Sequence, residues 1–175
     1  MRELILYFSR ADENYFGGSL KYIEKGNTEV VAEKAAAMTG ADLFKVEPVK
    51  PYSADYNTCI EQAKKDLQSG VRPEVVAMPE DMAQYDLVTV MYPIWWGDMP
   101  MPVYTFLEGH GFSGKIMIPF CTHEGSGLSG TEKSIENVCA DSEILSGLAI
   151  KGEDAQNSQN KAKQAVKEWL DSLSY

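Results

Sequence analysis

Two adjacent tryptophans are the most unusual chemical feature of this sequence. They lie in the segment Pro93-Ile94-Trp95-Trp96-Gly97, directly after an apolar run. Neighbouring side chains of an extended segment point in opposite directions, so both indole rings cannot enter one core. A planar aromatic ligand would supply the missing stacking partner, and Gly97 would let a backbone group meet a polar edge of that ligand. The alternative is structural: the pair covers an edge of a sheet or lies in a dimer interface.

A second segment carries groups that bind phosphate. Ser9 follows the first apolar run, and Gly26, Asn27 and Thr28 stand where the first long helix is expected to begin. A phosphate is held by backbone N–H groups, short hydroxyl donors and the positive end of a helix dipole. These residues offer all three without a lysine, which suits an acidic chain. The same residues also fit a simpler interpretation, an asparagine N-cap after a glycine turn.

A third segment, residues 122–127, reads Thr-His-Glu-Gly-Ser-Gly and lets main-chain N–H groups turn toward a ligand. His123 can hydrogen-bond that ligand or stand exposed as an ordinary loop histidine. Residues 125–130 also match the dinucleotide fingerprint Gly-x-Gly-x-x-Gly. That fingerprint belongs in the first βα turn, with an acidic residue ending the next strand. Here it follows the fourth expected strand, and the next one ends in Lys151, so we interpret it as a ring-binding loop.

Continuous apolar runs predict strands that are buried on both faces, as in a parallel sheet. The runs are residues 4–8, 87–92 and 116–120, with residues 42–46 and 144–150 as weaker candidates. Helical stripes separate them, and strict alternation predicts a parallel sheet with helices on both faces. Ligands of such sheets bind at the carboxyl ends of the strands. The three segments above follow three of these strands, so we expect them to meet.

Apolar residues at helical spacing predict five helices. The stripes lie within residues 31–38, 56–67, 103–107, 131–138 and 162–173. Ser53 is the expected cap of the second helix, and Ser129-x-x-Glu132 has the pattern of a capping box before the fourth. Residues 11–25 fit no element of the alternation.

Composition and charge limit the class of protein. The chain has 175 residues, which suits one domain over residues 1–175, and a net charge of −10. That charge argues against binding to nucleic acid or to an anionic membrane; it suits a basic protein partner, or simply keeps the protein in solution. Cys59, Cys121 and Cys139 form no C-x-x-C pair, and no signal peptide is recognisable, so we expect reduced thiols in the cytoplasm. With two histidines and no cysteine cluster, we expect no metal site.

Taken together, these segments resemble the flavodoxin-like flavoproteins over nearly the whole chain. The resemblance implies a doubly wound α/β fold with a five-stranded parallel sheet in the order 2-1-3-4-5, and FMN as cofactor. The implied phosphate ligands are Ser9, Arg10, Ala11, Asn27 and Thr28. The implied ring contacts are Pro93, Ile94, Trp95, Trp96 and Gly97 on one side, and Thr122, His123, Glu124, Gly125, Ser126 and Gly127 on the other.

The sequence departs from this family in two places. Residues 11–25 are inserted within the phosphate loop, and Asn14, Tyr15, Phe16 and Tyr22 either form a lid over the cofactor or pack as an inert excursion. The last strand, residues 144–150, is expected to run uninterrupted, as in short-chain flavodoxins.

Three functions remain open at this point. The chain is either an electron carrier between redox partner proteins or an NAD(P)H-dependent reductase of a quinone or similar small acceptor. A binding module that has lost its flavin is the third possibility, although an empty site would expose a large apolar patch around the tryptophans. No residue is assigned a catalytic role.

Overall fold

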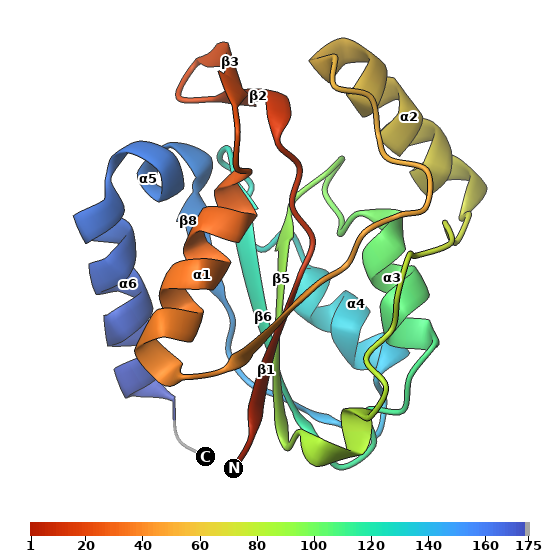
Figure 1. The fold of residues 1–175 in the computed structure, drawn as a ribbon, viewed down its shortest axis with the longest axis vertical. Helices are drawn as coiled ribbons and strands as arrows, with labels where there is room; N and C mark the ends of the chain where they lie inside the picture. The colour runs from red at the N-terminus through yellow and green to blue at the C-terminus, as the bar shows by residue number, and fades with distance from the viewer. Residues whose placement is uncertain (174–175) are drawn as a thin grey trace.

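A parallel sheet forms the centre of the computed structural model, which describes residues 1–173 (Figure 1). Its strands are β1 (Glu3–Tyr7), β4 (Asp42–Lys45), β5 (Leu87–Pro93), β6 (Ile116–His123), β7 (Glu143–Ile144) and β8 (Leu148–Lys151). They are ordered β4-β1-β5-β6-β7, with β8 also paired to β6. The predicted α/β fold and strand order 2-1-3-4-5 are confirmed.

Helices cover both faces of this sheet (Figure 1). One face carries α1 (Asn27–Thr39), α5 (Gly152–Asn157) and α6 (Gln159–Ser172), and the other carries α3 (Met101–Glu108) and α4 (Thr131–Val138). Alternate residues of β1 enter the two cores: Leu4 and Leu6 pack with the α3 side, whereas Ile5 packs with the α1 side. This double burial is the reason that the strands read as continuous apolar runs.

The last strand is interrupted, so the prediction of an uninterrupted strand over residues 144–150 was wrong. Pro119 of β6 lies beside the break and has no N–H with which to continue the ladder. A Cβ on Gly147 would lie 2.6 Å from the Pro119 carbonyl oxygen. The freed groups find other partners, because the Ser146 carbonyl accepts from Trp169 Nε1 and the Gly147 N–H donates to Glu132. The fifth strand of the prediction is therefore two short strands, β7 and β8.

The inserted segment forms a β-hairpin of its own, outside the central sheet (Figure 1). Strand β2 (Asp12–Phe16) pairs antiparallel with β3 (Ser19–Ile23). The two-residue turn uses Gly17 and Gly18, both at positive φ, which is the backbone of a type I′ hairpin turn.

Helix α2 (Tyr56–Ser69) stands away from the sheet, at the end of the molecule that also holds the hairpin (Figure 1). It contacts β2 and α3. Its N-cap is Asp55, whose carboxylate accepts from the Thr58 N–H at 2.7 Å. The expectation that Ser53 caps this helix was wrong, because Ser53 instead accepts from the Asp55 N–H.

A short 3-10 helix, η1 (Met82–Gln84), precedes β5. Within residues 1–173, no helix combines the length and the apolar character needed to cross a membrane.

Candidate functional site

A cavity of about 430 Å³ lies at the carboxyl ends of β1, β5 and β6. This volume is within the usual range for cofactor and small-ligand sites. The lining residues are Arg10, Asn14, Tyr15, Asn27, Tyr56, Cys59, Ile60, Ala63, Pro93, Ile94, Trp95, Trp96, Gly97, Thr122, His123, Glu124 and Ser126. The residues expected at the site that do not line it are Ser9, Ala11, Thr28, Gly125 and Gly127.

The tryptophan segment forms a tight turn at the cavity wall. Trp95 and Asp98 exchange two backbone hydrogen bonds, and the residues between them have φ values of 53° at Trp96 and 77° at Gly97. This is a type I′ turn, which requires positive φ at both central positions. A bulky residue there is strained by roughly 1–2 kcal/mol, and such strain is characteristic of functional sites.

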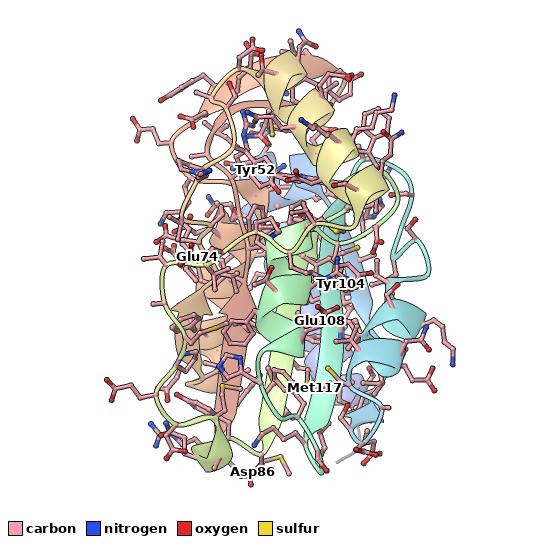
Figure 2. The ribbon with its side chains drawn as sticks, turned by 90° about the vertical axis from the view of Figure 1, so that its right-hand side faces the viewer. Tyr52, Glu74, Asp86, Tyr104, Glu108 and Met117 are labelled. Carbon is pink, nitrogen blue, oxygen red and sulfur yellow. The ribbon has the colours of Figure 1, made fainter. Side chains whose placement is uncertain are left out.

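The two indole rings occupy different environments, in agreement with the expectation that they cannot share one core. Trp95 packs edge-on against Phe8 and Tyr52, with ring centres 5.1 and 5.0 Å away. In Figure 2, Tyr52 lies beside α2. Trp96 is 48% exposed and donates from Nε1 to the Ile60 carbonyl of α2 at 2.8 Å. Trp95 is thus a rigid wall, and Trp96 both lines the cavity and fastens the turn to α2.

Ser129 also holds this turn, by donating to the Gly97 carbonyl at 2.9 Å. The expected capping box of Ser129 and Glu132 does not form. Gly130 is the N-cap of α4, in the left-handed conformation, and Glu132 accepts from Gly147.

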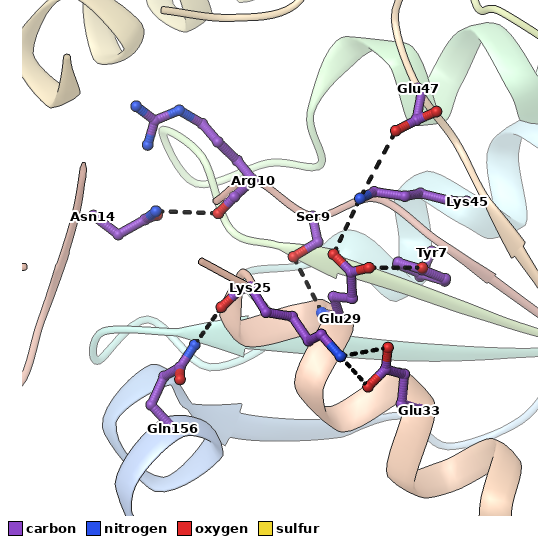
Figure 3. A network of polar contacts seen from close by, with 10 residues as sticks. All are labelled: Tyr7, Ser9, Arg10, Asn14, Lys25, Glu29, Glu33, Lys45, Glu47 and Gln156. Atoms are coloured by element: carbon purple, nitrogen blue, oxygen red, sulfur yellow. Dashed lines mark hydrogen bonds and ion pairs between the residues drawn. The ribbon is translucent and has the colours of Figure 1, made fainter. Parts of the chain in front are cut away.

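The predicted phosphate site lies at the start of α1. Ser9 Oγ accepts from the Glu29 N–H at 3.1 Å (Figure 3), and the N-cap Gly26 has no side chain to satisfy the N–H groups of Asn27 and Thr28. A Cβ at Gly26 would lie 2.2 Å from Ser9 Oγ, so only glycine lets the two segments of the predicted phosphate loop meet.

Asn27 carries a buried acceptor that a group with hydrogen-bond donors would satisfy. Its Oδ1 is buried and has no partner within the described residues, although such a buried oxygen normally accepts a hydrogen bond. A phosphate dianion cannot supply one, but a hydroxyl of the ribityl chain of FMN can. The residues present therefore fit FMN: α1 offers N–H groups to the phosphate, and Asn27 offers an acceptor to the adjoining chain.

Arg10 makes different contacts from those expected of a phosphate ligand. Its guanidinium donates to the main-chain carbonyls of Glu13, Ser53 and Ala54. Its own carbonyl accepts from Asn14 Nδ2 at 3.1 Å (Figure 3). Arg10 thus joins the hairpin to the segment that enters α2.

The third loop is organised around His123. Its Nδ1 accepts from the N–H groups of Gly125 and Gly127, at 2.9 and 3.2 Å. These glycine N–H groups therefore turn toward the histidine rather than toward the cavity. Burial, together with the charge of Lys151, lowers the pKa of His123. The neutral ring consequently carries its proton on Nε2, the nitrogen available as a donor.

Three further predicted residues have partners within the protein. Thr28 and Thr122 are buried and share a hydrogen bond of 2.8 Å between their hydroxyls, across α1 and β6. Glu124 accepts from the N–H of Gly17 at the hairpin tip, and burial raises the pKa of its carboxyl group.

The sequence-based prediction missed one wall of the cavity. Tyr56, Ile60 and Ala63 of α2 were predicted only as the apolar stripe of a helix flanking the sheet, and a stripe does not reveal what it faces. Cys59, which also lines the cavity, was given no role at the site. Asn14 and Tyr15 come from the hairpin, whose role was open.

Comparison with known proteins places the chain in a family. A family model described as flavodoxin matches residues 19–173. A solved Bacteroides eggerthii protein assigned as a flavoprotein is 28% identical, with 97% of this chain and 96% of that chain covered and a TM-score of 0.76.

Two more distant structures share the fold. A Lactobacillus acidophilus flavoprotein in complex with FMN is 18% identical over 91% of this chain and 98% of its own, with a TM-score of 0.63. An NADPH-quinone reductase from P. pentosaceus is 15% identical over 99% and 100%, with a TM-score of 0.53. No curated protein sequence matches significantly. The chain belongs to the flavodoxin family, and this membership supports FMN as its cofactor.

Proposed function

We propose that this protein is an FMN-dependent oxidoreductase that transfers electrons to a small planar acceptor of the quinone class. When bound, FMN supplies the redox chemistry, and the protein supplies binding, orientation and electrostatics. The observation that carries the proposal is the position of α2 and the hairpin. These two elements add a wall to a cavity that the strand ends alone would leave open.

In this proposal the chain's own residues hold the cofactor by its separate parts. The N–H groups at the start of α1 and the Ser9 hydroxyl bind the phosphate, and Asn27 Oδ1 accepts from the ribityl chain. Trp95, fixed by its two aromatic neighbours, forms one wall for the ring. His123 presents its Nε2–H from the opposite loop, as a donor to the ring edge or to an oxygen of the acceptor.

The covered wall favours a small-molecule acceptor over a protein. A carrier must bring its flavin edge against the surface of another protein, whereas here the turn at Trp96 is fastened to α2 and the hairpin tip to Glu124. The likeness in fold to a quinone reductase supports the same choice.

A second candidate, a carrier between redox proteins, is favoured by the net charge of −10, which suits docking to a basic partner. The two candidates predict different electron donors. Anaerobic stopped-flow mixing of the FMN-loaded protein with NADH or NADPH, followed by menadione, should bleach and then restore the flavin absorbance. If a reductase protein reduces the flavin and neither nucleotide does, the carrier is correct.

The proposal includes a cytoplasmic location. All three cysteines are free, as is usual for proteins of the reducing cytoplasm.

The cysteines are not assigned a redox role. All three are buried, and burial raises the pKa of Cys59, the one that lines the cavity. These thiols are therefore poor nucleophiles, and the redox chemistry is assigned to FMN alone.

A further inference from the structure

Two tyrosines from the hairpin and from α2 stand together at the cavity. Tyr15 and Tyr56 both line it, and their ring centres are 6.3 Å apart with an angle of 34° between the planes. Tyr15 is 45% exposed, so the pair lies toward the mouth. These residues belong to neither of the two loops expected to flank the flavin ring.

The tyrosine pair is held in place by polar contacts between its two elements. The Glu13 N–H donates to the Ala54 carbonyl at 3.2 Å, and Glu13 Oε1 accepts from the Tyr56 N–H at 3.0 Å. Arg10 donates to main-chain carbonyls on both sides of this junction. The strand that carries Tyr15 is thus fixed to the first turn of the helix that carries Tyr56, which pre-organises the two rings.

The hydroxyls of these tyrosines are free to bind a ligand. Tyr22 and Tyr52 donate their hydroxyls to Asp12 and Asp66, whereas no group within residues 1–173 accepts from Tyr15 or Tyr56. Burial raises the pKa of Tyr56, so its hydroxyl stays protonated at neutral pH and remains a donor.

We propose that Tyr15 and Tyr56 form the acceptor subsite, in which the aromatic faces bind a planar quinone ring and the hydroxyls donate to its carbonyl oxygens. This assignment rests on the proposed function and adds the residues that recognise the acceptor. It also gives the insertion at residues 11–25 a role: the hairpin contributes one half of the subsite. Arg10 is a positioning residue: it contacts the hairpin and the segment that enters α2, and so helps to hold the two tyrosine rings in place.

The test is an equilibrium titration of the oxidised, FMN-loaded protein with menadione, followed by the flavin difference spectrum. Oxidised flavin does not reduce a quinone, so the titration reports binding without turnover. Tyr15→Leu and Tyr56→Leu should each raise the menadione Kd roughly fivefold, the size expected for loss of an aromatic pair. Tyr15→Phe keeps the ring but loses the hydroxyl donor, so it should weaken menadione binding measurably but less than Tyr15→Leu does. Tyr22→Leu, on the same hairpin but 73% exposed and outside the cavity, is the matched control.

A parallel titration of each apoprotein with FMN separates the acceptor from the cofactor. The FMN affinity of each variant should stay within about twofold of wild type, since the rings of Tyr15 and Tyr56 are both assigned to the acceptor and not to FMN. A comparable loss of FMN affinity in both variants would overturn the proposal, and so would wild-type protein that fails to bind menadione or leucine variants that bind it normally. The proposed function fails separately, if menadione binds but does not reoxidise the dithionite-reduced protein.

Discussion

Trp96→Asn should separate the binding role of the tryptophan turn from its folding role. Trp96 has φ +53° beside Gly97, and Asn-Gly is the favoured sequence of a type I′ turn. The substitution removes roughly 1–2 kcal/mol of backbone strain. It also removes the hydrogen bond from Nε1 to the Ile60 carbonyl, worth about 1 kcal/mol, and the contact with Lys64, worth about 0.5 kcal/mol at an exposed site.

These contributions nearly cancel, so the free energy of unfolding of the apoprotein should change by less than about 1 kcal/mol. FMN affinity, in contrast, should fall about tenfold, because an indole that lines the cavity is lost. Urea unfolding of the apoprotein, followed by far-ultraviolet circular dichroism, measures the first quantity. Quenching of FMN fluorescence on titration measures the second.

Trp96→Phe is the matched control, because it keeps an aromatic ring and the strained backbone but loses the indole N–H. It should be less stable than Trp96→Asn and should bind FMN more tightly. A loss of more than about 2 kcal/mol in Trp96→Asn would show that the indole is part of the core. Unchanged FMN affinity would show that Trp96 is no wall of the ring site.

Three further changes probe the rest of the site. Gly152→Ala places a Cβ 2.3 Å from Asn27 Nδ2. It should lower the free energy of unfolding by about 1–3 kcal/mol through overpacking, and it should weaken FMN binding by displacing Asn27. An FMN affinity equal to that of wild type would contradict the role of Asn27 in binding FMN. Thr28→Val should destabilise the fold by about 2 kcal/mol in urea unfolding, because the Thr122 hydroxyl is left buried and unpaired, whereas the double valine variant should recover most of that loss; an additive double variant would refute the coupling. The lowered pKa of His123 stabilises the native state above the ordinary histidine pKa, and this contribution is lost as pH falls below about 6.5. His123→Asn keeps an acceptor for the two glycine N–H groups without titrating, so it should lose less stability than wild type between pH 7 and 5; equal losses would contradict this role.

The sheet was predictable because its physics is local. A strand covered on both faces must be apolar at every position, and β1, β5 and β6 therefore appear directly as continuous runs. The strand ends then place the loops after Phe8, Pro93 and His123 at one edge. The break between β7 and β8 was not visible in the same way, because it follows from Pro119 on the neighbouring strand.

The contacts within the loops were less predictable, since a polar group in a loop can form hydrogen bonds with several different partners. Arg10 looks like a phosphate ligand by its position but binds main-chain carbonyls instead. The N–H groups of Gly125 and Gly127 bind His123 and not the cavity. In each case the competing partner is provided by tertiary structure.

The wall formed by α2 was missed for another reason. The stripe of Ile60 and Ala63 indicates a buried face, but it does not distinguish a core from a cavity. One signal was present in the sequence: residues 11–25 fit no element of the alternation, and an insertion beside a binding loop adds material to the site.

The central claim is that this chain binds FMN through its phosphate as well as its ring, and titration of the purified apoprotein with FMN and with riboflavin tests it most directly. FMN should bind at one molecule per chain, quench its fluorescence and leave a yellow protein, and riboflavin should bind more weakly because the groups at the start of α1 lack their phosphate. A protein that stays colourless after FMN is added would contradict the account. Equal affinities for riboflavin and FMN would show that Ser9 and the start of α1 do not bind the phosphate.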